Sequence, residues 1–516
     1  MREWILAAPV FLPFVCGGLL LTAWFRRGEQ VRSRAVMGAV MAAVLANSLI
    51  IAWILYAHMG DRLVLFRLFG TLTVQFRPDP MGGVFAGLIA VLWPLATLYS
   101  LSYMEKDPRK TTFFAYYVMT YGVTAGIALA GNLVTLYFFY EMLTLVTFPL
   151  VLHPMTKAAA RASRKYLYYS IGGAAFAFIG LIFVLNYSAA GNTEFVPGGI
   201  LSPAAAAGSE GVLLLAYVLA FFGFGVKAAL FPVHGWLPSA AVAPTPVTAL
   251  LHAVAVVKSG AFAILRLTYY NYGTGFLKGT WAQWTVMAAA LITIVFASTT
   301  AVREIHWKRR LAYSTVSNLS YILFGAAVMT PLGLAAALCH MVAHAFMKIA
   351  SFFCAGAVMH QTGKTYVYEL DGLGRKMPVT FGCLTVASLS LMGIPLFAGF
   401  ISKWNLAQAG LQYAASFGDG GAGSVLPLAG VAVILYSALM TGIYMLTVLV
   451  RAYFPREAGA AAGRESAGGT EDGHPVTDPD WRMLVPLVIF AAVILALGLH
   501  SAPLMELLGR IGGEAA

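Results

Sequence analysis

The chain has 516 residues, of which 60% are hydrophobic and only 10% are charged, and its formal net charge is +12. A soluble domain carries roughly 25% charged residues, so this composition excludes an ordinary soluble fold and indicates a polytopic membrane protein. The four cysteines are scattered without CxxC spacing. They argue against an iron–sulfur or zinc centre and against a disulfide scaffold, and we expect no bound metal or cofactor.

Nucleotide and nucleic-acid binding are also disfavoured. No GxxxxGK[ST] motif is present, and the one GxGxxG match, at residues 418–423, lies in a short loop between apolar segments. Without a preceding strand this match indicates a flexible linker. The positive net charge is better explained by basic loops on one side of a membrane, so we expect no nucleic-acid partner.

Fourteen apolar segments have about the ~20 residues that cross the hydrocarbon core of a membrane. Residues 61–79 alternate apolar and polar side chains and predict a short extracytoplasmic hairpin. Residues 453–481 are rich in Ala, Gly and charge and predict a flexible cytoplasmic loop. The fourteen predicted spans are residues 4–25, 35–57, 81–103, 112–130, 132–153, 166–187, 211–231, 244–270, 282–302, 311–330, 332–358, 378–403, 427–450 and 483–503.

Lysine and arginine are unevenly distributed between alternate loops. With the N-terminus outside, the cytoplasmic loops hold 22 of the 33 basic residues and the outer loops hold 7, Arg266 among them. This asymmetry predicts a multi-pass protein of the cell (inner) membrane with both termini extracytoplasmic. The remaining basic residues, which lie inside or at the end of predicted spans, are Lys227, Lys258, Lys348 and Lys403.

Charged side chains at membrane depth are candidates for function, because each costs at least about 2.5–3.5 kcal/mol to insert. One lysine near a helix end can reach the interface with its head group, but four together are not explained in this way. The only acid well inside a span is Glu141, in an aromatic stretch. A Glu–Lys pair whose separation changes would switch the lysine between holding and releasing a proton; a static structural ion pair is the alternative.

His340, His344 and Lys348 are spaced four residues apart and therefore share one helix face over two turns. Histidines between lysines suit proton hopping, whereas two histidines without a nearby acid make a poor metal site. Plain hydrogen bonds to neighbouring helices are the alternative. His252 and Lys258 are six apart and do not share a face.

Two prolines interrupt lysine-bearing spans: Pro232 follows Lys227 in span seven, and Pro395 precedes Lys403 in span twelve. Such breaks are tolerated at membrane depth only where protein or a water-filled cavity surrounds them. Because the two spans are five apart, they have opposite orientations and predict an inverted repeat. The expected fold is therefore an all-α polytopic membrane protein of about 14 transmembrane helices, with two inverted five-helix repeats and broken helices 7 and 12.

This fold divides the chain into five regions. They are helices 1–3 (1–110), a first repeat of helices 4–8 (111–270), a second repeat of helices 9–13 (280–452), the loop 453–481, and a C-terminal helix 14 (482–516).

Several motifs resemble those of the antiporter-like subunits shared by complex I (the L-, M- and N-type chains of NADH:quinone oxidoreductase), membrane-bound hydrogenases and Mrp-type cation/proton antiporters. The motifs are residues 140–142, 226–238, 308–317 and 344–348, and the resemblance covers nearly the whole chain. It implies a buried axis along which protons are transferred. The residues it assigns to this axis are Glu141, Lys227, Lys258, His344, Lys348 and Lys403, with His252 and His340 as less secure members.

Two differences from the M-type and L-type chains of complex I indicate which type of antiporter-like subunit this chain resembles. Lys403 stands where the M-type chain carries glutamate, and the short stretch after Leu504 leaves no room for the lateral helix of an L-type chain. Both favour an Mrp D-like or N-like chain. The resemblance implies a proton-translocating, non-redox part of a complex-I-like, hydrogenase or Mrp translocase rather than an enzyme by itself. The expected partners are further membrane subunits, including antiporter-like chains, the lipid bilayer, and protons or Na⁺. The alternatives are Na⁺/H⁺ antiport as the Mrp D-type chain, or a non-conducting structural role.

Overall fold

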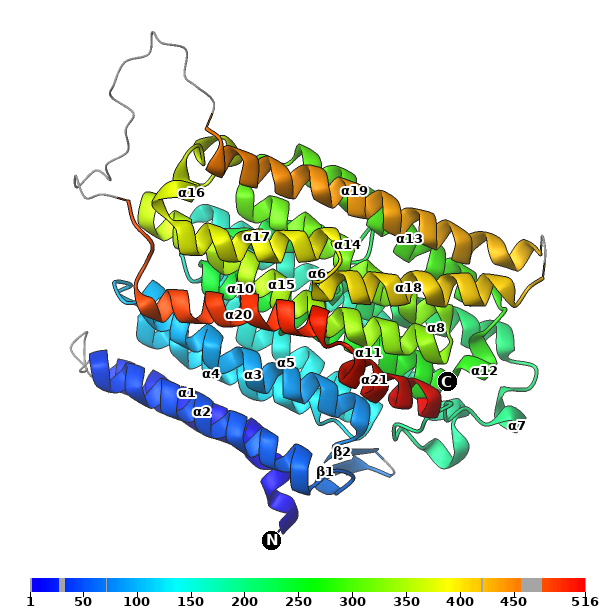
Figure 1. Ribbon diagram of the computed structural model, residues 1–516. Coiled ribbons are helices and arrows are strands. Elements are labelled where there is room, and N and C mark those ends of the chain that lie inside the picture. The colour runs from blue at the N-terminus through cyan, green and yellow to red at the C-terminus, as the bar shows by residue number, and fades with distance from the viewer. Residues whose placement is uncertain (1, 27–32, 71, 419–420, 456–475, 516) are drawn as a thin grey trace.

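The computed structural model describes residues 2–26, 33–70, 72–418, 421–455 and 476–515. Long helices lie side by side, with α1 and α2 along one edge and α19 along the opposite edge (Figure 1). Within the described residues, twelve helices are long and apolar enough to cross a membrane, so the protein is an all-helical multi-pass membrane protein apart from one small hairpin.

The first part of the chain is a series of long helices. Asn132 begins α5, because its side chain accepts a hydrogen bond from the backbone N–H of Thr135 at 2.8 Å. The helices of this part are η1 (Arg2–Ala7), α1 (Ala8–Arg26), α2 (Ser33–Ala57), α3 (Pro80–Tyr103), α4 (Lys110–Ala128), α5 (Leu133–Leu152), α6 (Lys157–Tyr187), η2 (Ala189–Gly191) and α7 (Pro203–Ala206).

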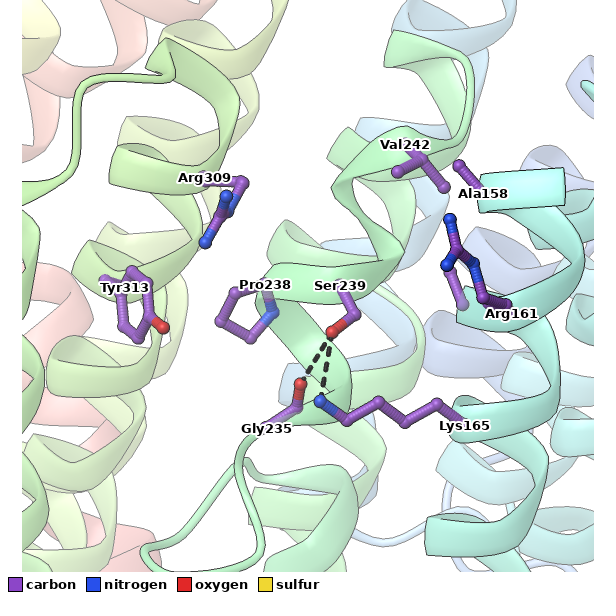
Figure 2. A pocket seen from close by; sticks show the side chains of 10 residues that line it. Ala158, Arg161, Lys165, Gly235, Pro238, Ser239, Val242, Arg309 and Tyr313 are labelled. Carbon is purple, nitrogen blue, oxygen red and sulfur yellow. Dashed lines mark hydrogen bonds between the residues drawn. The ribbon is translucent and has the colours of Figure 1, made fainter. Parts of the chain in front are cut away.

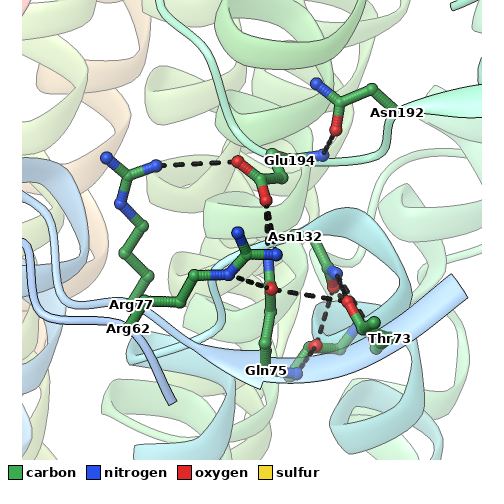
Figure 3. Close-up of polar contacts among 8 residues, drawn as sticks. Arg62, Thr73, Gln75, Arg77, Asn132, Asn192 and Glu194 are labelled. Carbon is green, nitrogen blue, oxygen red and sulfur yellow. Dashed lines mark hydrogen bonds and ion pairs between the residues drawn. The ribbon is translucent and has the colours of Figure 1, made fainter. Parts of the chain in front are cut away.

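The predicted hairpin at 61–79 is confirmed as two antiparallel strands, β1 (Leu63–Phe69) and β2 (Leu72–Phe76). The Gln75 N–H donates to Thr135 Oγ1 at 2.8 Å, which ties β2 to the start of α5. Glu194 pairs with Arg62 at 2.8 Å and with Arg77 at 3.7 Å (Figure 3). Polar contacts therefore fix the hairpin to the segment that follows α6.

The middle of the chain contains three candidate membrane spans, as predicted, together with several short helices. Its elements are α8 (Glu210–Lys227), α9 (Trp236–Ser239), η3 (Ala240–Val242), α10 (Thr245–Ala253), α11 (Val256–Arg266), the π-helical turn η4 (Leu267–Tyr272), α12 (Thr274–Leu277) and α13 (Trp281–Arg303). The span predicted at 244–270 is confirmed at Thr245–Tyr272, but its helix is interrupted, because the Ala255 N–H reaches back to the Leu250 carbonyl (2.9 Å) and the helix restarts at Val256.

The last part of the chain surrounds α15, whose side chains are almost all buried. Thr330 caps this helix by accepting from the Gly333 N–H at 3.1 Å, and Pro331 occupies its first turn. The elements are α14 (Trp307–Val328), α15 (Pro331–Thr362), η5 (Val367–Glu369), α16 (Leu373–Lys376), α17 (Pro378–Met392), α18 (Ala398–Ala415), η6 (Ala422–Ser424), α19 (Val425–Tyr453), α20 (Trp481–Leu499) and α21 (Ala502–Ala515). α20 runs between α3 on one side and α17 and α18 on the other (Figure 1).

Several predicted boundaries move. The span predicted at 166–187 begins at Lys157, because a basic stretch continues the helix beyond its apolar part. The span predicted at 378–403 is two helices, and the second runs on to Ala415 through polar residues that lowered its apparent hydropathy. The span predicted at 483–503 ends at Leu499 and is followed by the separate helix α21. The predicted loop 453–481 and linker 418–423 lie partly outside the described residues.

Candidate functional site

Glu141 and Lys227 face each other between α5 and α8. Lys227, the last residue of α8, is fully buried. Its ammonium donates a hydrogen bond to the Tyr140 carbonyl and lies 3.4 Å from the centroid of the Tyr140 ring. Glu141 Oε1 is 3.8 Å from Lys227 Nζ, and the Glu141 side chain is 32% exposed. The pair is therefore a loose ion contact between a buried cation and a partly buried carboxylate, whose Oε1 atom is itself buried.

The first residues of the break after Lys227, Ala228 to Leu230, are buried, whereas Pro232 farther along is exposed. The Trp236 indole N–H donates to the Val226 carbonyl at 2.7 Å, so one of the free carbonyls at the helix end has a partner. Gly260 of α11 packs directly on the break, where a Cβ atom would come to 2.5 Å from the Ala228 nitrogen. Pro232 lies in the non-helical stretch between α8 and α9.

Lys258 and His344 are joined across α11 and α15. Lys258 Nζ is hydrogen-bonded to His344 Nδ1, and both side chains are fully buried. His252 lies on α10, before the helix break, with its ring 4.8 Å from that of Phe352. Neither His252 ring nitrogen has a hydrogen-bond partner among the described residues.

The face of α15 that carries His340, His344 and Lys348 contacts three other helices. His340 Nδ1 is 2.9 Å from Ser402 Oγ of α18, and the His340 and His344 rings stack at 5.8 Å. Lys348 Nζ donates to Ser314 Oγ of α14 at 2.6 Å. The three side chains thus share one helix face and reach different neighbours.

Lys403 bridges the second broken helix. Its ammonium donates to the carbonyls of Leu391 at 2.6 Å and Met392 at 3.3 Å, the last residues of α17. A cation is favourable there because free carbonyls give a helix C-terminus partial negative charge. Pro395 lies between α17 and α18, and Gly498 of α20 packs on this break, where a Cβ atom would come to 2.2 Å from the Leu396 carbonyl oxygen.

A continuous series of contacts connects α11 with α18. Lys258 bonds to His344, whose ring stacks on that of His340; the His340 ring lies 5.2 Å from the Tyr321 ring, and Lys403 Nζ lies 5.4 Å from that ring's centroid. Within the described residues, no hydrogen bond or ion pair joins Lys227 or Glu141 to this series. The structure therefore brings Glu141 together with Lys227, and Lys258 together with His344, His340 and Lys403, whereas Lys348 bonds to Ser314 and His252 contacts Phe352 outside this series.

Two basic residues that were predicted to lie in loops, Arg266 and Lys308, are buried. Arg266, counted above as an outer-loop residue, is fully buried at the end of α11, where it forms an ion pair with Asp79 at the start of α3. Lys308, counted as a cytoplasmic-loop residue, is buried and donates to the Ala243 carbonyl at 2.8 Å. The signal for Arg266 was its position in a long apolar run, which the loop count ignored.

Asp79→Ala should destabilise the protein by about 3–5 kcal/mol, because it leaves the Arg266 guanidinium buried without its charged partner. We expect a lower melting temperature in detergent, with partial recovery in the double variant Asp79→Ala/Arg266→Met. Asp61→Ala, which removes a contact between exposed Asp61 and His58, is the matched control. Equal melting temperatures for the Asp79 and Asp61 variants would contradict this role.

Comparison with known proteins shows the family. Residues 130–419 match the family described as NADH:quinone oxidoreductase/Mrp antiporter, TM. The chain is 32% identical over 434 residues to NADH-quinone oxidoreductase subunit N of Desulforudis audaxviator, covering 83% of this chain and 82% of that protein. It is 34% identical over 342 residues to the A-type chain of the Na(+)/H(+) antiporter of Alkalihalophilus pseudofirmus, covering 63% of this chain but only 41% of that protein.

Two solved structures share the fold. A chain of the membrane-bound sulfane sulfur reductase, an archaeal respiratory membrane complex, superposes with a TM-score of 0.80 at 23% identity, covering 99% of this chain and 97% of that one. A chain of the Mrp complex from Dietzia sp. superposes with a TM-score of 0.80 at 22% identity, covering 100% and 98%. The family match over residues 130–419, together with the 32% identity to a relative covered over 82% of its length, shows that the chain belongs to the NADH:quinone oxidoreductase/Mrp antiporter transmembrane family.

Proposed function

We propose that the chain is a proton-translocating, antiporter-like subunit of a multisubunit membrane assembly. The observation that carries this proposal is the buried contact series from Lys258 through His344, His340 and Tyr321 to Lys403. Lysine and histidine side chains both bind and release protons. Basic groups at membrane depth are costly to insert, so their presence there indicates a function.

Several buried polar atoms of α10, α14 and α15 suit bound water. His340 Nε2, His344 Nε2 and both ring nitrogens of His252 are buried without a hydrogen-bond partner among the described residues, as are Asn318 Oδ1 and Ser320 Oγ. Buried polar atoms are normally satisfied by protein or water. Water molecules at these positions would connect the imidazoles into a path for proton hopping.

Glu141 and Lys227 supply the switch in this proposal. When Glu141 lies close, it stabilises the protonated Lys227; when it moves away, the buried ammonium loses its counter-charge and releases its proton. Lys227 and Lys258 pass the proton inward from the cytoplasmic side, and Lys348 and Lys403 carry it outward. No redox group belongs to the proposed subunit, so its driving force arrives from partner chains, further antiporter-like subunits among them.

The proposed architecture has fourteen transmembrane helices, counting α4 and the broken pair α17–α18 with the twelve long apolar helices. The broken helices α8–α9 and α17–α18 are the matched elements of two inverted repeats, residues 111–270 and 280–452, and both termini are extracytoplasmic. The matching of the two breaks is supported by the lysines that border them, Lys227 and Lys403, and by the glycine that packs on each break.

Na⁺/H⁺ antiport within an Mrp-type assembly is the second candidate. It is favoured by the lysine at position 403 and by the similarity to a chain of an Na(+)/H(+) antiporter. Assaying proton movement in membrane vesicles with Na⁺ or with choline separates the two functions, because only antiport requires Na⁺. A non-conducting structural role predicts no proton movement that depends on Lys258 or Lys403.

Glu141→Ala in the native assembly tests the proposal. We expect the rate of proton translocation to fall at least about tenfold, since groups that transfer protons typically contribute ~10²–10⁴-fold to a rate. The measurement is dye quenching in inverted membrane vesicles, with subunit content checked on the same vesicles. Glu210→Ala, which removes an exposed acid from the start of α8, is the matched control. An unchanged rate in assembled Glu141→Ala vesicles would refute the switch.

A further inference from the structure

A basic cavity of 480 Å³ lies where the first turns of α6, the segment α9–η3 and the first turns of α14 meet. Arg161 and Lys165 enter it from α6, and Arg309 faces it from α14 (Figure 2). Among the described residues, no acidic side chain lines it. Since three cations converge on one hollow, its ligand should be an anion.

The cations of this cavity are only partly neutralised. Arg309 is paired with Glu304 at 3.0 Å, and Lys165 Nζ donates to Ser239 Oγ at 3.2 Å. Arg161 has no ion-pair or hydrogen-bond partner in the part of the chain that the structure describes. Two of the three positive charges therefore lack a counter-charge from the described residues.

An apolar groove of 390 Å³ continues from the basic cavity along α6. Tyr169, Gly172 and Phe176 line it from α6, with Val226 of α8 and Val233 on the other side. The lining positions of α6 follow Arg161 and Lys165 at helical spacing, so cavity and groove share one helix face. A Cβ atom on Gly235 would lie 3.4 Å from both Lys165 Nζ and Tyr169 Oη, which places the junction of cavity and groove at these residues.

We propose that cavity and groove together bind one anionic phospholipid. The phosphate lies among Arg161, Lys165 and Arg309, and one acyl chain follows the groove between α6 and α8. Basic pockets between membrane helices attract anionic head groups, and a cavity followed by an apolar groove along a candidate span matches a lipid better than a free anion. The bound chain touches Val226, next to Lys227, and so braces the first helix break.

The test uses the purified full-length chain and native mass spectrometry of retained lipids, with dioleoyl phosphatidylglycerol and dioleoyl phosphatidylcholine as probes. We expect the wild type to retain phosphatidylglycerol in preference to phosphatidylcholine. Arg161→Gln/Lys165→Gln should weaken phosphatidylglycerol binding about 30-fold, since each basic residue near the head group contributes about fivefold. Arg164→Gln is the matched control, because Arg164 lies on the same helix, exposed and outside the cavity.

Gly172→Leu tests the groove separately. A Cβ atom at Gly172 meets nothing within 4 Å, and we expect the leucine side chain to occupy the groove and displace the acyl chain. Ala175→Leu, exposed and outside the groove, is its control. Equal retention of the two lipids by the wild type would overturn the proposal. So would displacement of the lipid by inorganic phosphate together with wild-type binding by Gly172→Leu, which would indicate a site for a small free anion.

Discussion

Lys227→Ala should reduce proton translocation by the native assembly to background. The substitution removes the buried ammonium that faces Glu141 and bonds to the Tyr140 carbonyl, and alanine has no group that can bind a proton. We expect a loss of ~10²-fold or more, measured by dye quenching in inverted vesicles. Lys157→Ala, which removes an exposed lysine from the start of α6, should leave the rate unchanged.

Lys227→Arg separates charge from proton exchange. Arginine keeps the positive charge opposite Glu141 but stays protonated, so translocation should remain strongly impaired while assembly and stability stay close to wild type. If arginine supported the wild-type rate, Lys227 would be a structural counter-charge to Glu141. The proposed switch would then have to be abandoned.

His344→Leu should interrupt the path between the two halves of the chain. It removes the imidazole that bonds to Lys258 and stacks on His340, and leucine has no group that can relay a proton. We expect proton translocation to fall by ~10²-fold or more. Because the substitution also leaves the buried Lys258 ammonium without this hydrogen-bond partner, subunit content is measured on the same vesicles and the rate is compared per assembled complex.

His360→Leu is the control for this experiment. His360 lies on the same helix as His344 but is exposed near its end, where its ring stands 5.3 Å from that of Tyr103. Its removal should leave translocation unchanged. Equal rates for the His344 and His360 variants would show that protons cross the chain by another route.

Hydropathy predicted most of the helices because lipid-facing and buried residues are both apolar in a membrane protein. The hairpin was predictable from its alternating pattern, since a strand places successive side chains on opposite faces. The length of α6 was underestimated, because Lys157 and Arg161 are as compatible with a helix outside the apolar core as with a loop. Hydropathy indicates which part of a helix lies in the apolar core of the membrane, and it does not indicate at which residue the helix begins or ends.

The break between α10 and α11 could not be predicted in the same way. No proline or glycine lies between His252 and Lys258, and the turn is formed by Val254 and Ala255 with backbone groups that bond to Leu250. Because of the break, His252 and Lys258 lie on two different helices, so the expectation that they occupy separate faces of one continuous helix does not apply. Tertiary packing determines the break between α10 and α11, and the local sequence contains no residue that predicts it.

The sequence allowed the lysines of the candidate site to be predicted, but not the hydrogen-bond acceptors to which they donate. Charges in apolar runs pointed to Lys227, Lys258, Lys348 and Lys403 because insertion penalises them. Their acceptors are mostly backbone carbonyls and a histidine, such as the Leu391 carbonyl for Lys403. Every residue has a carbonyl, so the sequence cannot show which ones a broken helix leaves free.

The position of α20 and α21 has a consequence for how the protein is made. α15, the buried helix that carries His340 and His344, packs against both α20 and α21, and Gly512 of α21 lies against Pro331 at its start. The ribosome reaches these two helices only after it has made every other described helix. During synthesis, the part of the α15 surface that α20 and α21 cover therefore remains uncovered until these last two helices dock.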